Sequence, residues 1–204
     1  FGFVVLAGDS QPVFITDSRY TIQAQEQVQG CAIASFSTPK SVLDVVLDTC
    51  KQGGVTKLGF EPSVSYSTWE SWAKKLEGIE LVPVGELLPP LRMIKTSEEV
   101  AKIREACKLA DACFEHIKRM VQPGVAEYDI GLEIEFYFRR HRATIAFDPI
   151  VASGPNSARP HARASERKLE VGDLLTLDFG AGLDGYNSDI TRTLFVGEIR
   201  ERER

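Results

Sequence analysis

The sequence predicts an α+β fold with a small α/β domain at residues 1–88, a linker at 89–96 and a second domain at 97–204. Three observations support this organisation. In the first domain, short runs of β-branched and aromatic residues alternate with amphipathic stretches, as strands and helices do in α/β domains. The linker contains two consecutive prolines. In the second domain, two helical patterns precede three strand patterns, which is typical of an α+β arrangement.

In the first domain, turn and cap residues separate the elements. Each predicted strand is bounded by Gly, Pro, Asp or Ser, and each of the first two predicted helices ends at glycine. The expected elements are strands at 3–7 and 13–16, a helix from Asp17 or Ser18 to about Gln29, a helix at 39–54, a strand in VTKLGFE, a helix at 66–77 and a strand in IELVPV.

The second domain is expected to open with two helices. Thr96, followed three residues later by Glu99, forms a capping box that predicts a helix start. A second helix is expected at 126–141, and strands are expected in FDPIVAS, LLTLDFGA and YNSDITRTLFVG. Apolar residues of the first helix recur every three or four positions and predict a buried stripe: Val100, Ile103, Cys107, Ala110, Phe114, Ile117 and Val121.

Composition excludes several classes of protein. The 204 residues are 43% hydrophobic and 26% charged, as in an ordinary globular protein. The net charge of −5 argues against a nucleic-acid-binding surface, and no apolar run approaches the roughly 18 residues of a membrane span. The four cysteines form no CxxC pair, which fits a reducing compartment. We therefore expect a cytoplasmic protein with neither nucleic acid nor membrane as partner.

Two aspartates, Asp178 and Asp189, lie on the two strands of a predicted hairpin, LDFGAGLDGYNSDITRT. If Leu183 and Asp184 form its loop, the aspartates are directly opposite, with Cβ atoms about 4.5–5.5 Å apart and their charges in conflict. If Asp184-Gly185 forms the turn, as Asp-Gly often does, the aspartates become diagonal neighbours. They stay on one face in both registers, because side chains alternate with period two.

Three explanations compete for this pair of carboxylates. Both can be solvated on an exposed face, they can share a proton with one pKa raised, or they can bind hard divalent metal ions. Arg192 cannot neutralise them, because its position in the strand places it on the opposite face from Asp189. The spacing alone favours the solvated pair.

Four stretches occur in one order: FITDSRY (14–20), KTSEEVAKIREACKLAD (95–111), FDPIVASGPNSARPHA (147–162) and the hairpin. Together they resemble the Xaa-Pro peptidases, the prolidase and aminopeptidase P group of pita-bread metallopeptidases. The resemblance implies a creatinase-type amino-terminal domain followed by the first half of a pita-bread domain. It also implies a metal-dependent exopeptidase that hydrolyses the bond between an amino-terminal residue and proline in a peptide or dipeptide.

The resemblance further implies roles for particular residues. The family holds two divalent ions, with Mn²⁺ expected and Co²⁺ or Zn²⁺ as alternatives, through two Asp, one His and two Glu. By resemblance, Asp178 would bind one ion and Asp189 would bridge both, and the ions would activate a water molecule. His161 matches the histidine that hydrogen-bonds the substrate. Thr191 shares the face of Asp189 and is a candidate for a supporting contact.

The chain departs from the family pattern after Thr193, where only LFVGEIRERER follows. The downstream His and two Glu of the family have no counterpart there. We therefore expect a fragment of a longer protein, inactive alone, that also lacks the first strand and helix of its amino-terminal domain. Since members of the family are usually dimers, a homodimer is expected.

Other functions on this architecture remain open. One is a non-catalytic peptide- or protein-binding module, as in histone-chaperone relatives; the presence of Asp178, Asp189 and His161 weighs against it. Methionine aminopeptidase is another, although it commonly lacks the domain that carries TDSRY. Creatinase, which binds no metal, is disfavoured by the two aspartates. Within the leading group, the quoted residues fit a dipeptidase and an aminopeptidase alike.

Overall fold

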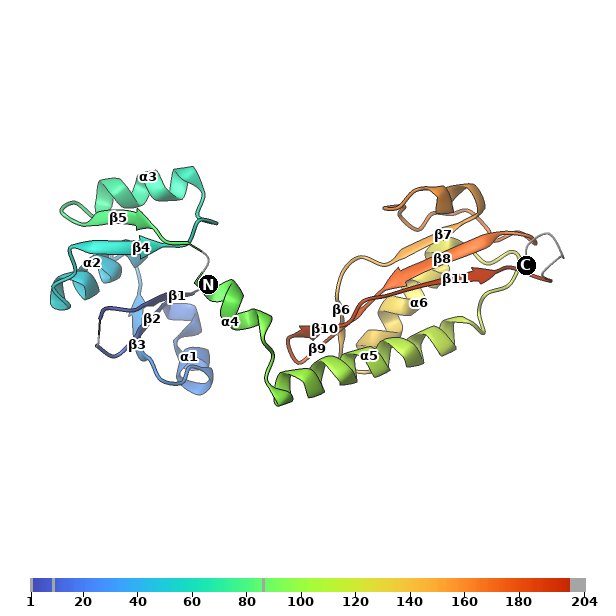
Figure 1. Ribbon diagram of the computed structural model, residues 1–204, viewed down its shortest axis with the longest axis horizontal. Helices are drawn as coiled ribbons and strands as arrows, with labels where there is room; N and C mark the ends of the chain where they lie inside the picture. The colour runs from blue at the N-terminus through green and yellow to red at the C-terminus, as the bar shows by residue number, and fades with distance from the viewer. Residues whose placement is uncertain (1, 9, 86, 199–204) are drawn as a thin grey trace. The chain divides into compact units, whose positions relative to one another are not determined.

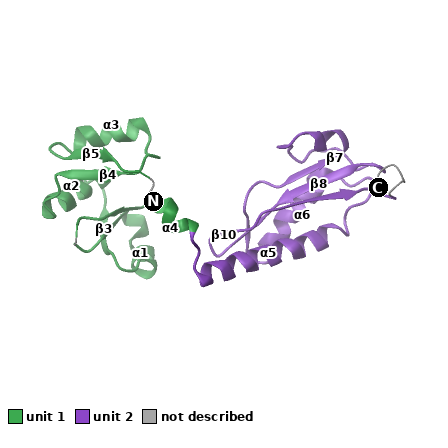
Figure 2. Cartoon of the chain, in the orientation of Figure 1, with its two compact units in different colours: residues 1–93 green, residues 94–204 purple. Residues whose placement is uncertain are grey.

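The computed structural model describes residues 2–8, 10–85 and 87–198 (Figure 1). The chain divides into two compact units, Phe1–Met93 and Ile94–Arg204 (Figure 2). Each unit has its own cluster of buried apolar side chains. Within the described ranges, no helix is both long enough and apolar enough to cross a membrane.

The first unit alternates strands and helices along the chain. Its elements are β1 (Gly2–Val5), β2 (Val13–Asp17), η1 (Ser18–Tyr20), α1 (Thr21–Gln27), β3 (Ala32–Phe36), α2 (Val42–Gln52), β4 (Lys57–Phe60), α3 (Tyr66–Lys75), β5 (Glu80–Pro83) and α4 (Leu88–Met93). Strand β2 pairs antiparallel with β1 and parallel with β3, while β4 and β5 form a second parallel pair. Helices α1 and α3 supply the crossovers that parallel pairs require.

Local caps set the helix boundaries of the first unit. Helix α2 begins after Ser41, whose side chain accepts a hydrogen bond from the Asp44 backbone in a reciprocal capping box. Pro39 therefore lies before the helix instead of inside its first turn. The helix expected from Asp17 or Ser18 is divided into a 3₁₀ turn and α1. Strand β3 was not predicted from the sequence.

Helix α4 overlaps the segment predicted to be a linker and begins one residue before it, with Pro89 and Pro90 in its first turn. Proline is tolerated there because the first backbone N–H groups of a helix have no intrahelical acceptor. Several large apolar side chains on and beside this helix are exposed, including Leu87, Leu91 and Ile94.

The second unit packs two helices against antiparallel strands. Its elements are α5 (Ser97–Ile117), α6 (Glu127–Arg140), β6 (Thr144–Ile145), β7 (Ile150–Ser153), η2 (Gly154–Ala158), β8 (Leu174–Phe179), β9 (Ala181–Leu183), β10 (Tyr186–Asn187) and β11 (Ile190–Phe195). One sheet has the order β11-β8-β7, and a smaller one has the order β10-β9-β6. Helices α5 and α6 lie along one side of these strands (Figure 1).

The core of this unit lies between the helices and β8. Leu175, Leu177 and Phe179 are fully buried in one cluster with Ile134 and Phe138 of α6. Burying each such side chain stabilises the fold by about 1.5–3 kcal/mol. Because side chains alternate along a strand, the even-numbered positions of β8, which include Asp178, lie on the opposite face. The packing of β8 therefore decides which face carries the aspartate.

The predicted cap of α5 is confirmed, and its predicted buried stripe is only partly correct. Thr96 and Glu99 form the reciprocal capping box. Val100, predicted to be buried, is 41% exposed. The buried residues of the helix are Ala106, Ala110, Cys113 and Ile117. Small side chains line this face, so a pattern built on large apolar residues places the stripe slightly off its true position.

Candidate active site

The hairpin turns at Asp184-Gly185. Leu183 pairs with Tyr186 across it, and the two turn residues have φ angles of +50° and +81°. Positive φ at both central residues is typical of a type I′ turn, which Asp-Gly accepts and leucine does not. The register with a Leu183-Asp184 loop is therefore wrong, and the register with Asp184-Gly185 as the turn is confirmed.

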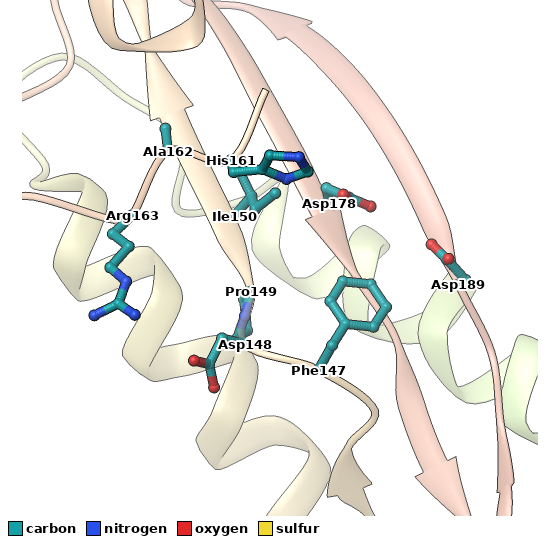
Figure 3. A pocket seen from close by; sticks show the side chains of 9 residues that line it. All are labelled: Phe147, Asp148, Pro149, Ile150, His161, Ala162, Arg163, Asp178 and Asp189. Carbon is teal, nitrogen blue, oxygen red and sulfur yellow. The ribbon is translucent and has the colours of Figure 1, made fainter. Parts of the chain in front are cut away.

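In this register the two aspartates are diagonal neighbours on one face. Asp178 pairs with Thr191, and Asp189 lies two residues before Thr191 on the same chain. Asp178 is half-buried and Asp189 is exposed. Their carboxylates point toward one another (Figure 3). The Thr191 hydroxyl donates a hydrogen bond of 2.9 Å to Asp178 Oδ1 and thereby fixes one of the two carboxylates.

Gly180 and Ser188 set the path of the chain between the aspartates. A Cβ atom at Gly180 would overlap the carbonyl oxygen of Ser188, so the close approach requires glycine. The Ser188 N–H donates to the carbonyl of Ala181, and the Ala181 N–H donates to Ser188 Oγ, both over 2.9 Å. This clamp places Asp189, the next residue, beside the end of β8.

A cleft of about 450 Å³ opens on this face of the sheet (Figure 3). It brings together three of the predicted site residues: Asp178, Asp189 and His161. The His161 ring lies near Asp178, whereas the charged ends of Asp148 and Arg163 point away from the two aspartates. The complete lining is Phe147, Asp148, Pro149, Ile150, His161, Ala162, Arg163, Asp178 and Asp189.

The donors in the cleft fit part of a metal centre. Two facing carboxylates suit hard divalent ions such as Mn²⁺. Across the described ranges, no group of three or more His, Cys, Asp or Glu side chains is arranged to hold a metal. His161, Asp178 and Asp189 are therefore not arranged as a set of three ligands in this structure. A pair of carboxylates can supply two ligands of a larger set.

A buried carboxylate that does not line the cleft was not found by sequence reasoning. Glu127, the first residue of α6, is 0% exposed. Its Oε1 accepts from the N–H and hydroxyl of Ser153 over 2.6 and 2.7 Å. Its Oε2 accepts from the N–H and hydroxyl of Ser165 over 3.1 and 2.6 Å, and from Asn156 Nδ2 over 2.8 Å. Burial alone raises the pKa of Glu127, but these hydrogen bonds outweigh it and lower the pKa.

An ion pair extends this network. Arg167 Nη1 and Nη2 donate to Asp173 over 2.6 and 3.0 Å, and Nη1 also donates to Ser153 Oγ over 2.6 Å. Gly154 leaves room for the pair, because a Cβ atom there would lie 2.5 Å from Asp173 Oδ1.

Comparison with known proteins gives two family matches. Residues 101–204 match metallopeptidase family M24, and residues 1–94 match the creatinase/prolidase N-terminal domain. An uncharacterized peptidase of Bacillus subtilis is 46% identical over 199 residues, which are 97% of this chain and 56% of that protein. An Xaa-Pro dipeptidase of Pyrococcus furiosus is 31% identical over 204 residues, which are 100% of this chain and 56% of that protein.

Solved structures give the same result. An Xaa-Pro dipeptidase from Bacillus anthracis has a TM-score of 0.92 and 42% identity, and the match covers 99% of this chain and 56% of that one. Prolidase from Pyrococcus furiosus has a TM-score of 0.86 and 30% identity, with 99% and 58% covered. The chain thus spans little more than half the length of the relatives it matches. Their likeness confirms the predicted α+β class and its creatinase-type and pita-bread parts.

Proposed function

The chain belongs to metallopeptidase family M24, and from this premise we propose that the whole protein hydrolyses the peptide bond between an amino-terminal residue and proline. Relatives named Xaa-Pro dipeptidase and putative Xaa-Pro aminopeptidase support this substrate class. The observation that carries the proposal is the convergence of Asp178 and Asp189 on a cleft that also contains His161. A proline-containing peptide or dipeptide is the proposed substrate, in a cytoplasmic homodimer.

Asp178 and Asp189 are the proposed metal ligands. When bound, a pair of divalent ions supplies a water of lowered pKa and polarises the scissile carbonyl. Asp178 would hold one ion, and Asp189, at the break between the strands, would contact both. Thr191 orients Asp178 by donating to Oδ1, as residues that support metal ligands commonly do.

His161 is the proposed substrate-contacting residue. Imidazole can donate a hydrogen bond or move a proton near neutral pH, and the ring lies beside Asp178 at the cleft. Phe147 and Ile150 add apolar surface to the same cleft, which suits a proline ring. Because this chain holds only part of the expected ligand set, we propose that it is inactive by itself.

The test uses the full-length protein with Mn²⁺, Xaa-Pro dipeptides and longer Xaa-Pro peptides. Asp178→Asn and Asp189→Asn should each lower Mn²⁺ affinity and turnover by about 100-fold or more, since loss of a supporting residue alone costs about 10–100-fold. Asp184→Asn is the matched control: it removes a carboxylate from the same hairpin, and Asn tolerates the positive φ of the turn. That variant should bind Mn²⁺ and turn over substrate as the unmodified protein does.

Two outcomes would contradict the proposal. A full-length protein that binds no metal and gains no activity with Mn²⁺ would leave the non-catalytic binding module as the function of the cleft. Robust turnover by the 204-residue chain alone would contradict its proposed inactivity.

A further inference from the structure

The segment that carries His161 is closed at its base by one side chain. Residues 154–164 leave the sheet after Ser153 and lead to Ser165, whose carbonyl oxygen accepts from the Tyr128 N–H in the first turn of α6. Both serines donate hydrogen bonds to Glu127, Ser153 to Oε1 and Ser165 to Oε2. The two carboxylate oxygens therefore join the two ends of this segment, which we call the His161 loop.

A third hydrogen bond reaches further into the loop. Asn156 Nδ2 donates to Glu127 Oε2 over 2.8 Å and to the carbonyl oxygen of Arg163 over 3.4 Å. Arg163 is two residues from His161. The Glu127 carboxylate is thus connected through Asn156 to the part of the loop that bears the imidazole.

The centre of this network, Glu127 and Ser153, is buried, and its other members are half-buried. Across the described ranges, no buried side-chain nitrogen or oxygen lacks a hydrogen-bond partner. Polar networks of this kind strengthen one another in a medium of low dielectric constant and specify a single arrangement. Among the described residues, the groups that donate to the Glu127 carboxylate belong to the His161 loop or to the residues at its two ends. The carboxylate therefore fixes the loop and not a neighbouring surface.

His161 depends on this support because its own ring is not held. Within the described ranges, the structure gives the His161 ring no hydrogen bond, and the side chain is exposed. Its position over the cleft is therefore set by the backbone of the loop. A shift of about 1 Å in a substrate-contacting group can cost on the order of 100-fold in rate.

We propose that Glu127 is a positioning residue: it holds the His161 loop so that the imidazole faces Asp178 and Asp189, and it contacts no substrate itself. This inference rests on the proposed function, in which His161 contacts the substrate. It also assigns the SGPN run, residues 153–156, to the support of the loop. Ser153 and Asn156 bind Glu127, and Gly154 leaves room for the Arg167–Asp173 pair.

Glu127→Gln in the full-length protein is the first test. The variant keeps the volume of the side chain, but its amide NH₂ faces donors that previously met a carboxylate oxygen. Amide hydrogen exchange of the His161 loop, measured by mass spectrometry, should become at least about tenfold faster, because a buried acceptor is lost. Exchange in α5 should not change.

Two further variants make this comparison specific. Glu133→Gln is the matched control: it lies on the same helix and accepts from His116 and Arg140, without a bond to the His161 loop. Asn156→Ala removes the hydrogen bond from the loop to Glu127 Oε2, together with the weaker bond to the Arg163 carbonyl, without altering α6. It therefore remains informative if Glu127→Gln fails to fold. The control should leave loop exchange unchanged, and Asn156→Ala should accelerate it.

Kinetics of the full-length protein with Mn²⁺ separate positioning from general stabilisation. Glu127→Gln should lower kcat on the order of 10–100-fold, with KM little changed. In a protein that already carries His161→Ala, adding Glu127→Gln should cost no further activity, because both changes act through one imidazole.

Unchanged loop exchange in both Glu127→Gln and Asn156→Ala would overturn the proposal. Losses in kcat that multiply in the double variant would also overturn it, since they would show a route that bypasses His161. A full-length protein without peptidase activity would refute the proposed function and the catalytic part of this inference. Loop exchange would still decide whether Glu127 anchors the loop.

Discussion

Replacing Gly180 with alanine tests whether the close approach of two backbone segments holds the aspartates together. The added Cβ atom would overlap the carbonyl oxygen of Ser188 and lie 2.8 Å from its carbonyl carbon and 3.2 Å from Ala146 Cβ. Two of the three contacts are backbone atoms, so no side-chain rotation relieves them. The Ser188 backbone must move, and Asp189 must move with it.

The cost follows from this geometry. Overpacking typically costs about 1–3 kcal/mol, and a forced backbone shift places Gly180→Ala near or above the top of that range. In a domain of 150–250 residues, each kcal/mol lowers Tm by about 2–4 °C, so we expect a fall of roughly 6–12 °C. A shift on the order of 1 Å in Asp189 should also weaken Mn²⁺ binding.

The assay is thermal unfolding of the full-length protein, followed by Mn²⁺ titration. Gly182→Ala is the matched control two residues along the same hairpin. Its Cβ atom would meet Thr144 Oγ1 at 2.5 Å and Asn187 Oδ1 at 3.1 Å, both of them side-chain atoms that can turn away. A Gly180→Ala variant with the Tm and Mn²⁺ affinity of Gly182→Ala would refute the reasoning.

Two other predictions concern carboxylates away from the cleft. Burial raises the pKa of Asp173, but hydrogen bonds from Arg167 and the Glu170 backbone outweigh burial and lower it. The stabilisation from the Arg167–Asp173 pair is therefore present above the pKa of Asp in the unfolded chain, near 3.9. It is lost as the pH falls through the lower pKa of Asp173 in the folded protein. Asp173→Asn should cost roughly 1.5–3 kcal/mol in urea unfolding at pH 7, and the difference should shrink at pH 3; an equal difference at both pH values would contradict this. Hydrogen bonds from the Thr96 backbone and, next, from the Tyr186 hydroxyl lower the pKa of Glu99. Tyr186→Phe should therefore raise that pKa. NMR titration would show no change in that pKa if the hydrogen bond is unimportant.

The parts of the fold that sequence predicts well are those fixed by neighbouring residues. The capping box at Thr96 and Glu99 formed as expected, because its partners are three residues apart. Helix α6 begins and ends within one residue of the predicted 126–141. The two candidate turns were decided by the φ angles of residues 184 and 185, and Asp-Gly is the pair that tolerates them.

Features that depend on distant partners were missed. Strand β3 forms by pairing with β2, and its small residues give no strong strand pattern. Glu127 is in the first turn of a helix, where an acidic residue is favourable whatever its partners. Its hydrogen-bond donors are 26–38 residues away in the chain, so no local pattern reveals the network.

For the site, resemblance contributed more than geometry. Spacing alone favoured a solvated pair of aspartates, whereas the ordered motifs indicated a metallopeptidase, and the family matches confirm that resemblance. The structure brings His161, Asp178 and Asp189 to one cleft. Their roles as ligands and substrate contact stay predictions until the metal and kinetic experiments are done.

Strand β8 is hydrogen-bonded on both edges, to β7 through Ile150 opposite Asp178 and to β11 through Thr191 opposite the same residue. A small shift of β7 or β11 should therefore also move the Asp178 carboxylate. Substitutions in β7 and β11 that lie away from the cleft should therefore change Mn²⁺ affinity before they lower Tm. Measuring Mn²⁺ affinity across a set of such variants would show how far along these strands the effect extends.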